Sequence, residues 1–369
     1  MLSKRAAAVA VLVAFSLGLI GSLAIRPPGS SESVRIDPAM PTTMRIHWRV
    51  PISNPGTLPV VGENSVWFAK TVGEITAGAI RLDTYDPGEI VPSFGITDAV
   101  RDGKVDAGFT WLGYDQGKIP AAALIAATPF GMEPWEFSAW WFEAGGRELG
   151  EALFHEHNIH PIYCGMTGPE TAGWFKEEIR STSDLEGLKI RFAGLGGKVM
   201  ERAGASVTML PPGEIFQALE KGAIDATEFA LPIVDESLGF NRIAKINYYP
   251  GWHQPFTASH FVVNLQTWQS ISQPDRDLLT TACAAAVTRN LARSEALQGA
   301  VIARFPDIGV SARRLPEPLL RELDALTQAL LDEEAAKDEK FARILASQRQ
   351  FEGEYRHWKR LAYLPRDFR

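Results

Sequence analysis

One pattern of residues occurs twice in this chain. Residues 99–107 (Ala-Val-Arg-Asp-Gly-Lys-Val-Asp-Ala) align without a gap with residues 218–226 (Ala-Leu-Glu-Lys-Gly-Ala-Ile-Asp-Ala). Each copy has the pattern of a helix end, a glycine that closes the helix in a left-handed turn, and the start of a buried strand. A single copy is a common joint in many folds. Two copies predict one such joint in each of two lobes.

The segments around both copies alternate between strand and helix patterns. Strands are predicted over residues 44–50, 80–85, 105–111, 188–192, 206–210 and 224–229. Helices are predicted over 64–75, 97–102, 197–203 and 214–220. This alternation predicts an α/β fold in which each lobe is a mainly parallel sheet flanked by helices. Because ligands bind beyond the carboxyl ends of such strands, residues 109–111 and 228–229 are expected at a cleft between the lobes.

Composition agrees with two lobes and excludes some classes of partner. A single core stops growing efficiently at about 250–300 residues, and the chain has 369. Its 37 Lys and Arg against 44 Asp and Glu give a net charge of −7, which has the wrong sign for a nucleic-acid-binding surface. The two cysteines, Cys164 and Cys283, allow at most one disulfide and leave open whether it forms.

The N-terminus has the pattern of an export signal. Lys4 and Arg5 precede an apolar run over residues 6–25. A charged segment followed by an apolar one is typical of a secretory signal peptide, although about 20 apolar residues could also span a bilayer as an uncleaved anchor. We therefore expect a signal peptide or anchor over 1–25 and a Pro- and Ser-rich tether over 26–43. Both place the rest of the chain outside the cytoplasmic membrane.

Several motifs in a fixed order resemble one family. Residues from about 44 to 351 resemble the periplasmic solute-binding subunits of tripartite ATP-independent (TRAP) transporters. The resemblance rests on the motifs over residues 103–107, 185–191, 213–220 and 222–226. The stretches 167–175 and 249–254 resemble a narrower subgroup that binds 2-oxo or 2-hydroxy monocarboxylates, such as pyruvate or lactate, together with a metal ion.

The resemblance implies a two-lobed periplasmic binding protein fold with long C-terminal helices. We expect lobe I over 44–165 with about 254–288, and lobe II over 166–253 with about 289–315. A C-terminal helical segment is expected over 316–369. The implied function is capture of a pyruvate-like acid with a bound cation between the lobes and its delivery to the membrane permease subunits. The alternatives are a secreted metal-dependent enzyme acting on 2-oxo acids and a ligand-sensing partner of a membrane signalling protein.

Arg191 is the candidate anion anchor. It lies between Ile190 and Phe192 near the end of a predicted strand, where a buried charge needs a partner. A guanidinium matches a carboxylate in a bidentate manner. The residues alone leave open a structural ion pair with a neighbouring acid. The resemblance implies that Arg191 clamps the ligand carboxylate.

Two carboxylates are the candidate metal ligands. The resemblance implies that a side chain at Glu170, the carboxylate of Glu228 and the backbone carbonyl of Phe229 contact a metal ion. Hard cations such as Na⁺ or Ca²⁺ take oxygen ligands of this kind. The sequence departs from the subgroup, which usually has Gln in place of Glu170 and often Trp in place of Phe229. The second negative charge favours a divalent ion. The alternatives are a salt bridge between Glu228 and Arg191 and a solvated loop charge at Glu170.

Aromatic and amide side chains are expected to form the walls of the pocket, because a small anion needs a dry site with few polar groups. The candidates that contact the substrate, besides Arg191 and Glu170, are Trp111, Tyr114, Phe130, Trp252 and Gln254. Tyr114 and Gln254 are the stronger candidates since they can also form hydrogen bonds. The alternative for each aromatic residue is ordinary core packing.

The histidines do not form a persuasive catalytic set. His155, His157 and His160 are close in sequence, but residues two apart point to different helix faces, and the stretch is expected to be an exposed turn. His253 lies in a Trp-rich turn without a Ser or Cys nucleophile motif. We therefore predict a binding protein and no enzyme.

The C-terminal segment has an amphipathic pattern. Apolar residues recur every three or four positions in the segment from Leu319 to Trp358, which predicts about 40 residues of helix, either continuous or interrupted. A helix of this length either straps both lobes or reaches a second subunit. The resemblance implies a homodimer through exchanged C-terminal helices.

Overall fold

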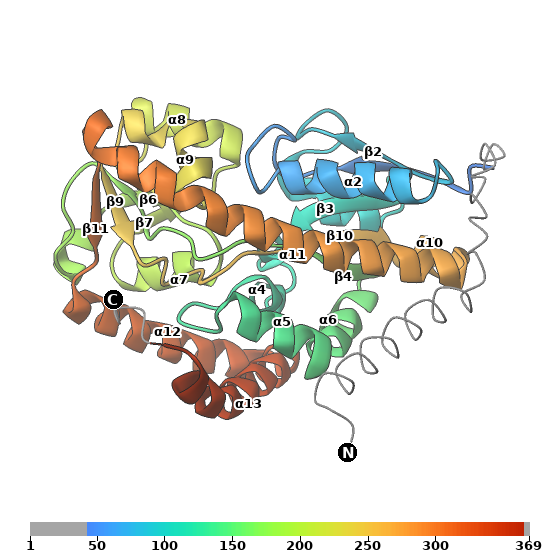
Figure 1. Ribbon diagram of the computed structural model, residues 1–369. Coiled ribbons are helices and arrows are strands. Elements are labelled where there is room, and N and C mark those ends of the chain that lie inside the picture. The colour runs from blue at the N-terminus through green and yellow to red at the C-terminus, as the bar shows by residue number, and fades with distance from the viewer. Residues whose placement is uncertain (1–42, 365–369) are drawn as a thin grey trace, which may run out of the picture. The chain divides into compact units, whose positions relative to one another are not determined.

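The computed structural model describes residues 43–364 (Figure 1). The expected signal peptide or anchor, and the tether up to residue 42, lie outside this range. The strands are β1 (Ile46–Pro51), β2 (Ile80–Tyr85), β3 (Ala107–Trp111), β4 (Ile159–Met166), β5 (Gly173–Phe175), β6 (Lys189–Arg191), β7 (Ser206–Thr208), β8 (Ala226–Thr227), β9 (Ile246–Tyr249), β10 (Ala258–Asn264) and β11 (Ser311–Arg314).

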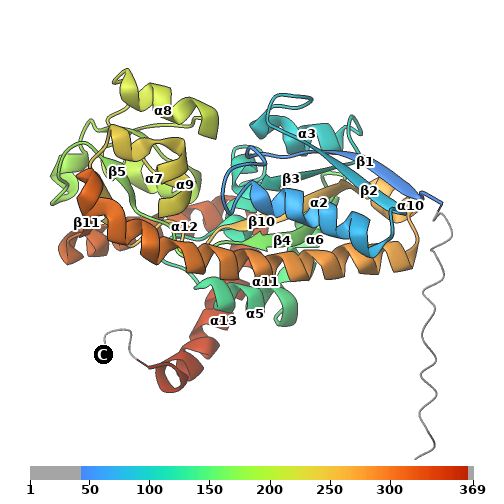
Figure 2. The same ribbon diagram turned by 45° about the horizontal axis from the view of Figure 1, so that its top comes forward.

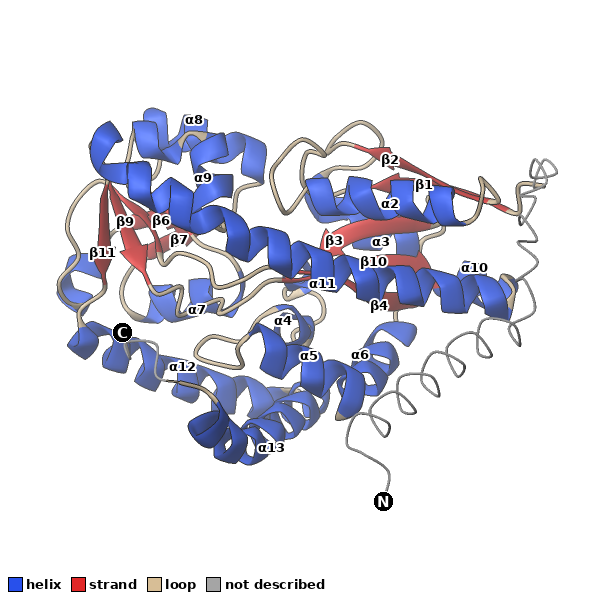
Figure 3. Ribbon diagram, viewed as in Figure 1, coloured by secondary structure: helices blue, strands red, loops and turns tan. Residues whose placement is uncertain are grey.

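Helices cover these strands (Figure 3). They are α2 (Glu63–Ile75), α3 (Ile96–Arg101), α4 (Ala122–Ala126), α5 (Pro134–Glu143), α6 (Gly146–His155), α7 (Gly194–Arg202), α8 (Pro212–Glu220), α9 (Pro232–Leu238), α10 (Leu265–Ser270), α11 (Gln273–Arg304), α12 (Glu317–Lys337) and α13 (Glu339–Ala362). Among the described residues, no helix combines the length and the apolar character needed to cross a membrane.

The repeated joint is confirmed in both places. Gly103 ends α3 with a φ of 67°, and Gly222 ends α8 with a φ of 70°. In the first copy the N–H groups of Gly103 and Lys104 donate to the carbonyls of Val100 and Ala99, at 3.1 and 2.9 Å. The second copy closes the corresponding two bonds, at 3.2 and 2.9 Å. These are the two bonds of a Schellman helix end, and each is followed by a buried strand.

The strands form two groups, which we call the first and second lobes. The first lobe contains the parallel pair β1–β2 and a sheet of order β3-β10-β4, and the two are joined by a parallel bridge between Ile52 and Phe109. The second lobe is one sheet of order β11-β9-β5-β8-β6-β7. The α/β class is confirmed.

Each lobe also contains one antiparallel strand that the sequence pattern did not indicate. β10 is antiparallel to both of its neighbours in the first lobe, and β5 is antiparallel to both of its neighbours in the second. β5 is the first strand after the chain leaves β4, and β10 is the first after it leaves β9, so each is entered directly from the other lobe. No helix separates the two strands of either connection.

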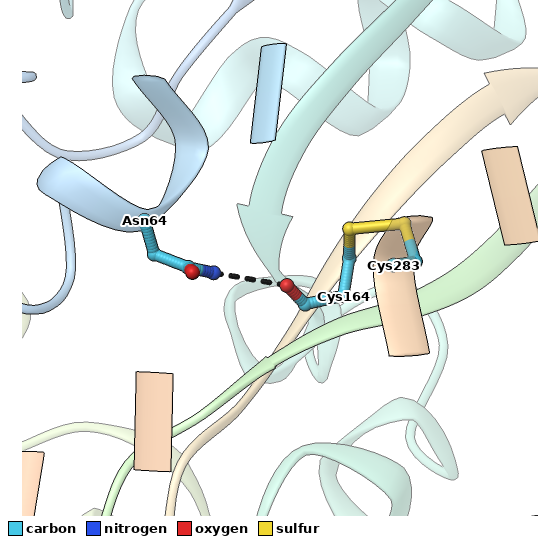
Figure 4. Close-up of a disulfide and its surroundings, with 3 residues drawn as sticks. All are labelled: Asn64, Cys164 and Cys283. Carbon is cyan, nitrogen blue, oxygen red and sulfur yellow. Dashed lines mark hydrogen bonds between the residues drawn. A yellow bond between two sulfur atoms is a disulfide. The ribbon is translucent and has the colours of Figure 1, made fainter. Parts of the chain in front are cut away.

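The long helix α11 packs along both lobes. It contacts β4 and α2 in the first lobe and α9 in the second, and Figure 2 shows it running past both groups of strands. A disulfide between Cys164 of β4 and Cys283 of α11 fixes the helix to the first lobe (Figure 4). Asn64 of α2 donates to the Cys164 carbonyl at 2.9 Å. The expected lobe boundary near residue 288 falls inside this continuous helix and stays a prediction.

The C-terminal pattern forms two helices. Asp338 interrupts it, and its side chain caps α13 by accepting from the N–H groups of Lys340 and Phe341. α12 packs against α7 of the second lobe, whereas α13 packs against α4, α5 and α6 of the first. The apolar stripe is buried as far as Leu345, but Trp358 and Leu361 near the end of α13 are 61% and 88% exposed. The C-terminal helices therefore strap both lobes and leave an apolar end uncovered within the chain.

Candidate ligand and cation site

A small cavity lies where residues of both lobes meet. Its volume is about 30 Å³, which is close to the volume that one water molecule occupies in the liquid. The cavity is lined by six of the residues that the sequence singled out, namely Trp111, Tyr114, Glu170, Arg191, Phe229 and Gln254. Trp111 ends β3, Arg191 ends β6, and Phe229 comes two residues after β8. The strand ends therefore meet at the cavity, as expected for sheets with parallel strands.

Arg191 forms a buried ion pair with Glu228. The Arg191 Nη1 donates to the Glu228 carboxylate at 2.5 Å and to the Glu228 carbonyl at 2.8 Å. Its Nε donates to the carbonyl of Leu210 at 3.3 Å. The alternative of a structural pair with a neighbouring acid is thus present in the structure. Within residues 43–364 the Nη2 of Arg191 makes no hydrogen bond, so one end of the guanidinium fork remains free for a ligand.

Glu228 is held in place from several sides. Its second carboxylate oxygen accepts from the backbone N–H of Ala193 at 2.9 Å, and its own N–H donates to the Arg191 carbonyl at 3.1 Å. The Phe229 ring lies 5.3 Å from the Arg191 guanidinium carbon. β6 and β8 are parallel neighbours in the sheet, which brings Arg191 and Glu228 close together. The contacts described above then fix the orientation of both charged groups.

Glu170 is buried, so the alternative of a solvated loop charge is wrong. Only 3% of the residue is exposed, although it lies in the Gly- and Pro-rich loop between β4 and β5. One carboxylate oxygen accepts a hydrogen bond from the Thr257 hydroxyl, which in turn accepts from the Gln254 amide at 2.9 Å. The other oxygen is buried and has no hydrogen-bond partner in the described part of the chain. Burial raises the pKa of Glu170 to about 8, and the Thr257 bond opposes this shift.

His253 lies beside both carboxylates. Its Nε2 is 3.6 Å from the Glu170 carboxylate and 3.8 Å from the Glu228 carboxylate. Neither ring nitrogen has a hydrogen-bond partner among the described residues. Burial lowers the pKa of His253 to about 4, so the ring is neutral at pH 7 and does not neutralise the acids.

The donor set fits a hard cation. Two buried carboxylates both lie within 4 Å of the His253 Nε2, and one Glu170 oxygen is unpartnered. The backbone carbonyl of Phe229 follows directly after Glu228 in the chain. An unpartnered buried oxygen costs free energy that a bound cation would remove. On these observations the residues present can hold Na⁺ or Ca²⁺.

Trp111 and Tyr114 form one wall of the cavity. Their rings meet edge to face with centroids 5.0 Å apart. Burial raises the pKa of Tyr114 to about 12, so its hydroxyl stays protonated and can donate to an anion.

Phe130 and Trp252 were expected to contact the substrate, but they do not line the cavity. Trp252 packs against the rings of Phe130 and Phe192, with centroids at 5.4 and 5.9 Å. These contacts fit the alternative of ordinary core packing.

The sequence analysis missed Thr257, Asn54 and Ser259, which also line the cavity. Thr257 precedes β10, whose return from the second lobe brings it opposite the Glu170 loop. Asn54 follows β1, and Ser259 lies in β10. Small polar side chains of this kind give no signal in a single sequence, because only the long-range strand pairing brings them to the site.

Comparison with known protein families identifies the chain's relatives. Residues 55–338 match the model of bacterial extracellular solute-binding proteins, family 7 (DctP). The chain is 35% identical over 317 residues to a monocarboxylate 2-oxoacid-binding periplasmic protein of Nostoc sp. strain PCC 7120, covering 86% of each chain.

Solved structures of similar proteins have the same fold. A TRAP transporter solute-binding protein from Bordetella bronchiseptica is 30% identical with a TM-score of 0.85, over 87% of this chain and 95% of that one. It is a dimer of mixed occupancy, with copurified calcium and picolinate in the bound site. A TRAP periplasmic solute-binding protein from Pseudoalteromonas atlantica, with sodium and pyruvate bound, is 31% identical with a TM-score of 0.83, over 86% and 97%.

Proposed function

The chain belongs to the bacterial extracellular solute-binding proteins of family 7, the solute-binding subunits of TRAP transporters, and on this premise we propose that it captures a small 2-oxo or 2-hydroxy monocarboxylate, such as pyruvate, together with a bound cation. The family is one of solute-binding transport proteins and not of enzymes. The observation that carries the proposal is one cavity lined by both Arg191 and Glu170. Among the described residues the Arg191 Nη2 makes no hydrogen bond, and one Glu170 carboxylate oxygen has no partner.

Arg191 would bind the ligand carboxylate. Its Nη1 and Nε are already committed to Glu228 and Leu210, so the guanidinium cannot rotate away from the cavity. The free Nη2 then offers a charge-assisted hydrogen bond of fixed direction. The Tyr114 hydroxyl and the Gln254 amide supply further polar contacts on the opposite wall.

The carboxylates of Glu170 and Glu228 and the carbonyl of Phe229 would hold the cation. When bound, the cation supplies positive charge to the ligand carboxylate and its neighbouring oxygen. The cation would replace the proton that burial keeps on Glu170 up to about pH 8, and would offset the repulsion between the two acids and the ligand carboxylate. The second carboxylate, at Glu170, favours Ca²⁺ over Na⁺. Similar proteins have been solved with either ion.

The volume of the cavity limits the size of the ligand that it can hold. A space of about 30 Å³ is too small for pyruvate without movement, so we infer that the two lobes separate to admit it and close over it. The buried aromatic pair of Trp111 and Tyr114 would then exclude chains much longer than that of pyruvate.

The partners follow from the family. A TRAP solute-binding protein delivers its ligand to membrane permease subunits, and we infer a periplasmic location, with residues 1–25 as the signal peptide or anchor. We also propose a homodimer through the C-terminal helices. Its support is the exposed apolar end of α13, where Trp358 and Leu361 lie close in sequence, and the dimer described for the similar Bordetella protein.

A thermal-shift screen tests the proposal. The protein, stripped of metal, is heated with each of a set of small carboxylates, with and without Na⁺ or Ca²⁺. We expect 2-oxo and 2-hydroxy monocarboxylates to raise the melting temperature, and more so with the cation present. Acetate, which has a carboxylate but no 2-oxo or 2-hydroxy oxygen, is the matched control and is expected to have a much smaller effect. Equal shifts with acetate and pyruvate would contradict the proposed ligand class.

A further inference from the structure

A second cluster of metal-ligating side chains lies in the first lobe. Glu151 and His155 are one turn apart on α6, and His160 is the second residue of β4. One ligand atom from each of the three residues lies within 4.8 Å of the other two. None of these residues lines the ligand cavity, so the cluster is separate from the site described above.

The sequence analysis predicted no metal site among these histidines. His155 and His157 are two residues apart and do not share a helix face. His160 was expected in an exposed turn, but β4 already begins at Ile159, and His160 is only 7% exposed. The strand turns the His160 ring back toward the end of α6, where Glu151 and His155 share one face because they are four residues apart.

The two imidazoles face each other closely. The Nε2 of His155 lies 2.9 Å from the Nδ1 of His160. Two nitrogens bound to one tetrahedral Zn²⁺ at about 2.0–2.1 Å each would lie about 3.3–3.4 Å apart, so the two rings would have to separate by about 0.4–0.5 Å. The His160 ring is fixed by stacking on Trp268 of α10, with centroids 4.3 Å apart and planes at 13°. One ligand is therefore already oriented, and the flexible Glu151 side chain can complete the set.

The surroundings suit a cation that prefers nitrogen. Burial lowers the pKa of His155, and burial also lowers the pKa of His160 to about 3, so both rings are neutral at pH 7. The facing nitrogens share one hydrogen bond, so a metal ion that replaced it would require one ring to move its proton to its other nitrogen. His155 is the last residue of α6, where the carbonyl end of the helix dipole favours positive charge. Two imidazoles with one carboxylate match Zn²⁺ better than Na⁺ or Ca²⁺, which take oxygen ligands.

A cavity of about 500 Å³ gives access to the cluster. Glu151 and His160 line it, together with Asp277, Arg147 and Arg276. The two arginines oppose a cation, but Arg147 also lies 4.0 Å from the Glu151 carboxylate and 3.3 Å from that of Glu148, and Asp277 adds a second negative charge. The charged groups of this cavity therefore balance, and its free space leaves room for water as a further ligand.

We propose that Glu151, His155 and His160 form a binding site for a transition-metal ion of the Zn²⁺ class, distinct from the cation site in the ligand cleft. The bound ion joins the end of α6 to β4 and stabilises the first lobe. It takes no part in ligand capture, because the two sites share no residue.

Zinc titration of the full, tag-free, metal-stripped protein tests this site. A chromophoric chelator reports competition for Zn²⁺, with saturating Ca²⁺ and pyruvate present to occupy the cleft. We expect one Zn²⁺ to bind per chain, and His155→Ala, at a half-buried position, to weaken binding by at least about tenfold. His157→Ala is the matched control, since it removes a neighbouring imidazole outside the cluster, and is expected to keep wild-type affinity.

A second variant distinguishes loss of the metal site from misfolding of the protein. Glu151→Gln keeps the size of the side chain and is expected to weaken Zn²⁺ binding in the same way, with an unchanged circular dichroism spectrum. Zn²⁺ is also expected to raise the melting temperature of the wild type but not of His155→Ala. The proposal is overturned if the wild type binds no Zn²⁺ under these conditions, or if His155→Ala and Glu151→Gln bind it as tightly as His157→Ala does.

Discussion

The Arg191 guanidinium and the Glu228 carboxylate lie 2.5 Å apart in an ion pair whose side chains are 1% and 0% exposed. The two residues come from the ends of neighbouring parallel strands, β6 and β8. Moving these two charges out of water costs free energy. Removing one partner would leave the other charge buried and unpaired, which is strongly destabilising. Together with the bond to Leu210, it holds Arg191 in one orientation at the wall of the cavity. In the proposed function the ion pair would prepare the anion site before any ligand arrives.

Arg191→Lys tests the shape of this anchor. Lysine keeps the charge but cannot reach Glu228, Leu210 and a ligand at once, so ligand affinity is expected to fall by roughly 1.5–3 kcal/mol. Calorimetric titration with pyruvate measures the loss, and circular dichroism checks the fold. Wild-type affinity in a folded Arg191→Lys protein would remove Arg191 from the binding site.

Glu228→Gln tests the cost of an unbalanced buried charge. The variant leaves the Arg191 guanidinium buried without its counter-charge, which is expected to lower the free energy of unfolding by about 3–5 kcal/mol. Urea denaturation without ligand measures this change. Glu178→Gln, which breaks an exposed ion pair with Arg313, is the control and is expected to leave the midpoint nearly unchanged. Equal midpoints for the two variants would contradict the structural role of Glu228.

The raised pKa of Glu170 predicts a dependence of stability on pH. In the folded protein this carboxyl keeps its proton up to about pH 8, whereas its ordinary pKa is 4.5. Between these values the folded state binds more protons than the unfolded state. Stability without metal is therefore lost as pH rises, by at most about 1.4 kcal/mol per pH unit from this group.

Glu170→Gln removes this contribution. The melting temperature of the variant, measured with chelator and a non-coordinating cation, is expected to exceed that of the wild type by more at pH 8 than at pH 5. Thermal unfolding monitored at both pH values provides the comparison. The same difference at both pH values would mean that Glu170 does not titrate in this range.

The disulfide between Cys164 and Cys283 closes a loop with a sequence separation of 119 residues. Removing a link across so long a loop is expected to cost roughly 3–5 kcal/mol of stability. The double variant Cys164→Ala with Cys283→Ala, compared with the reduced wild type by urea denaturation, measures it. Both proteins should have the same lowered midpoint. If reduction leaves the midpoint unchanged, the link between β4 and α11 contributes nothing measurable.

The sequence predicted best the features that depend on residues close together in the chain. The glycines at 103 and 222 were identified because a left-handed helix end demands them, and the strands that follow them lead to the cavity. Arg191 was identified because a charged residue between two apolar ones on a buried strand needs a partner. The resemblance to the transporter family supplied the roles of Glu170 and Glu228, which no local pattern indicated.

The remainder depends on long-range contacts. The antiparallel strands β5 and β10 could not be predicted, because their pairing is decided by strands distant in sequence. Thr257 reaches Glu170 only through that pairing. The residue types of Trp252 and Phe130 could not decide whether they line the pocket or pack in the hydrophobic core, since an aromatic residue suits both places. The lobe boundaries, the permease partner and the dimer stay predictions.

The central claim is that ligand and cation bind as a coupled pair. Calorimetric titration of pyruvate into metal-stripped protein, repeated at saturating Ca²⁺ and at saturating Na⁺, tests it directly. We expect either ion to raise pyruvate affinity by roughly 5–150-fold, Ca²⁺ more than Na⁺, and pyruvate to raise cation affinity by the same factor, as linkage requires. Glu170→Gln is expected to reduce the advantage of Ca²⁺ over Na⁺. Equal pyruvate affinity with and without either cation would contradict the account, and Arg191 alone would then have to bind the carboxylate.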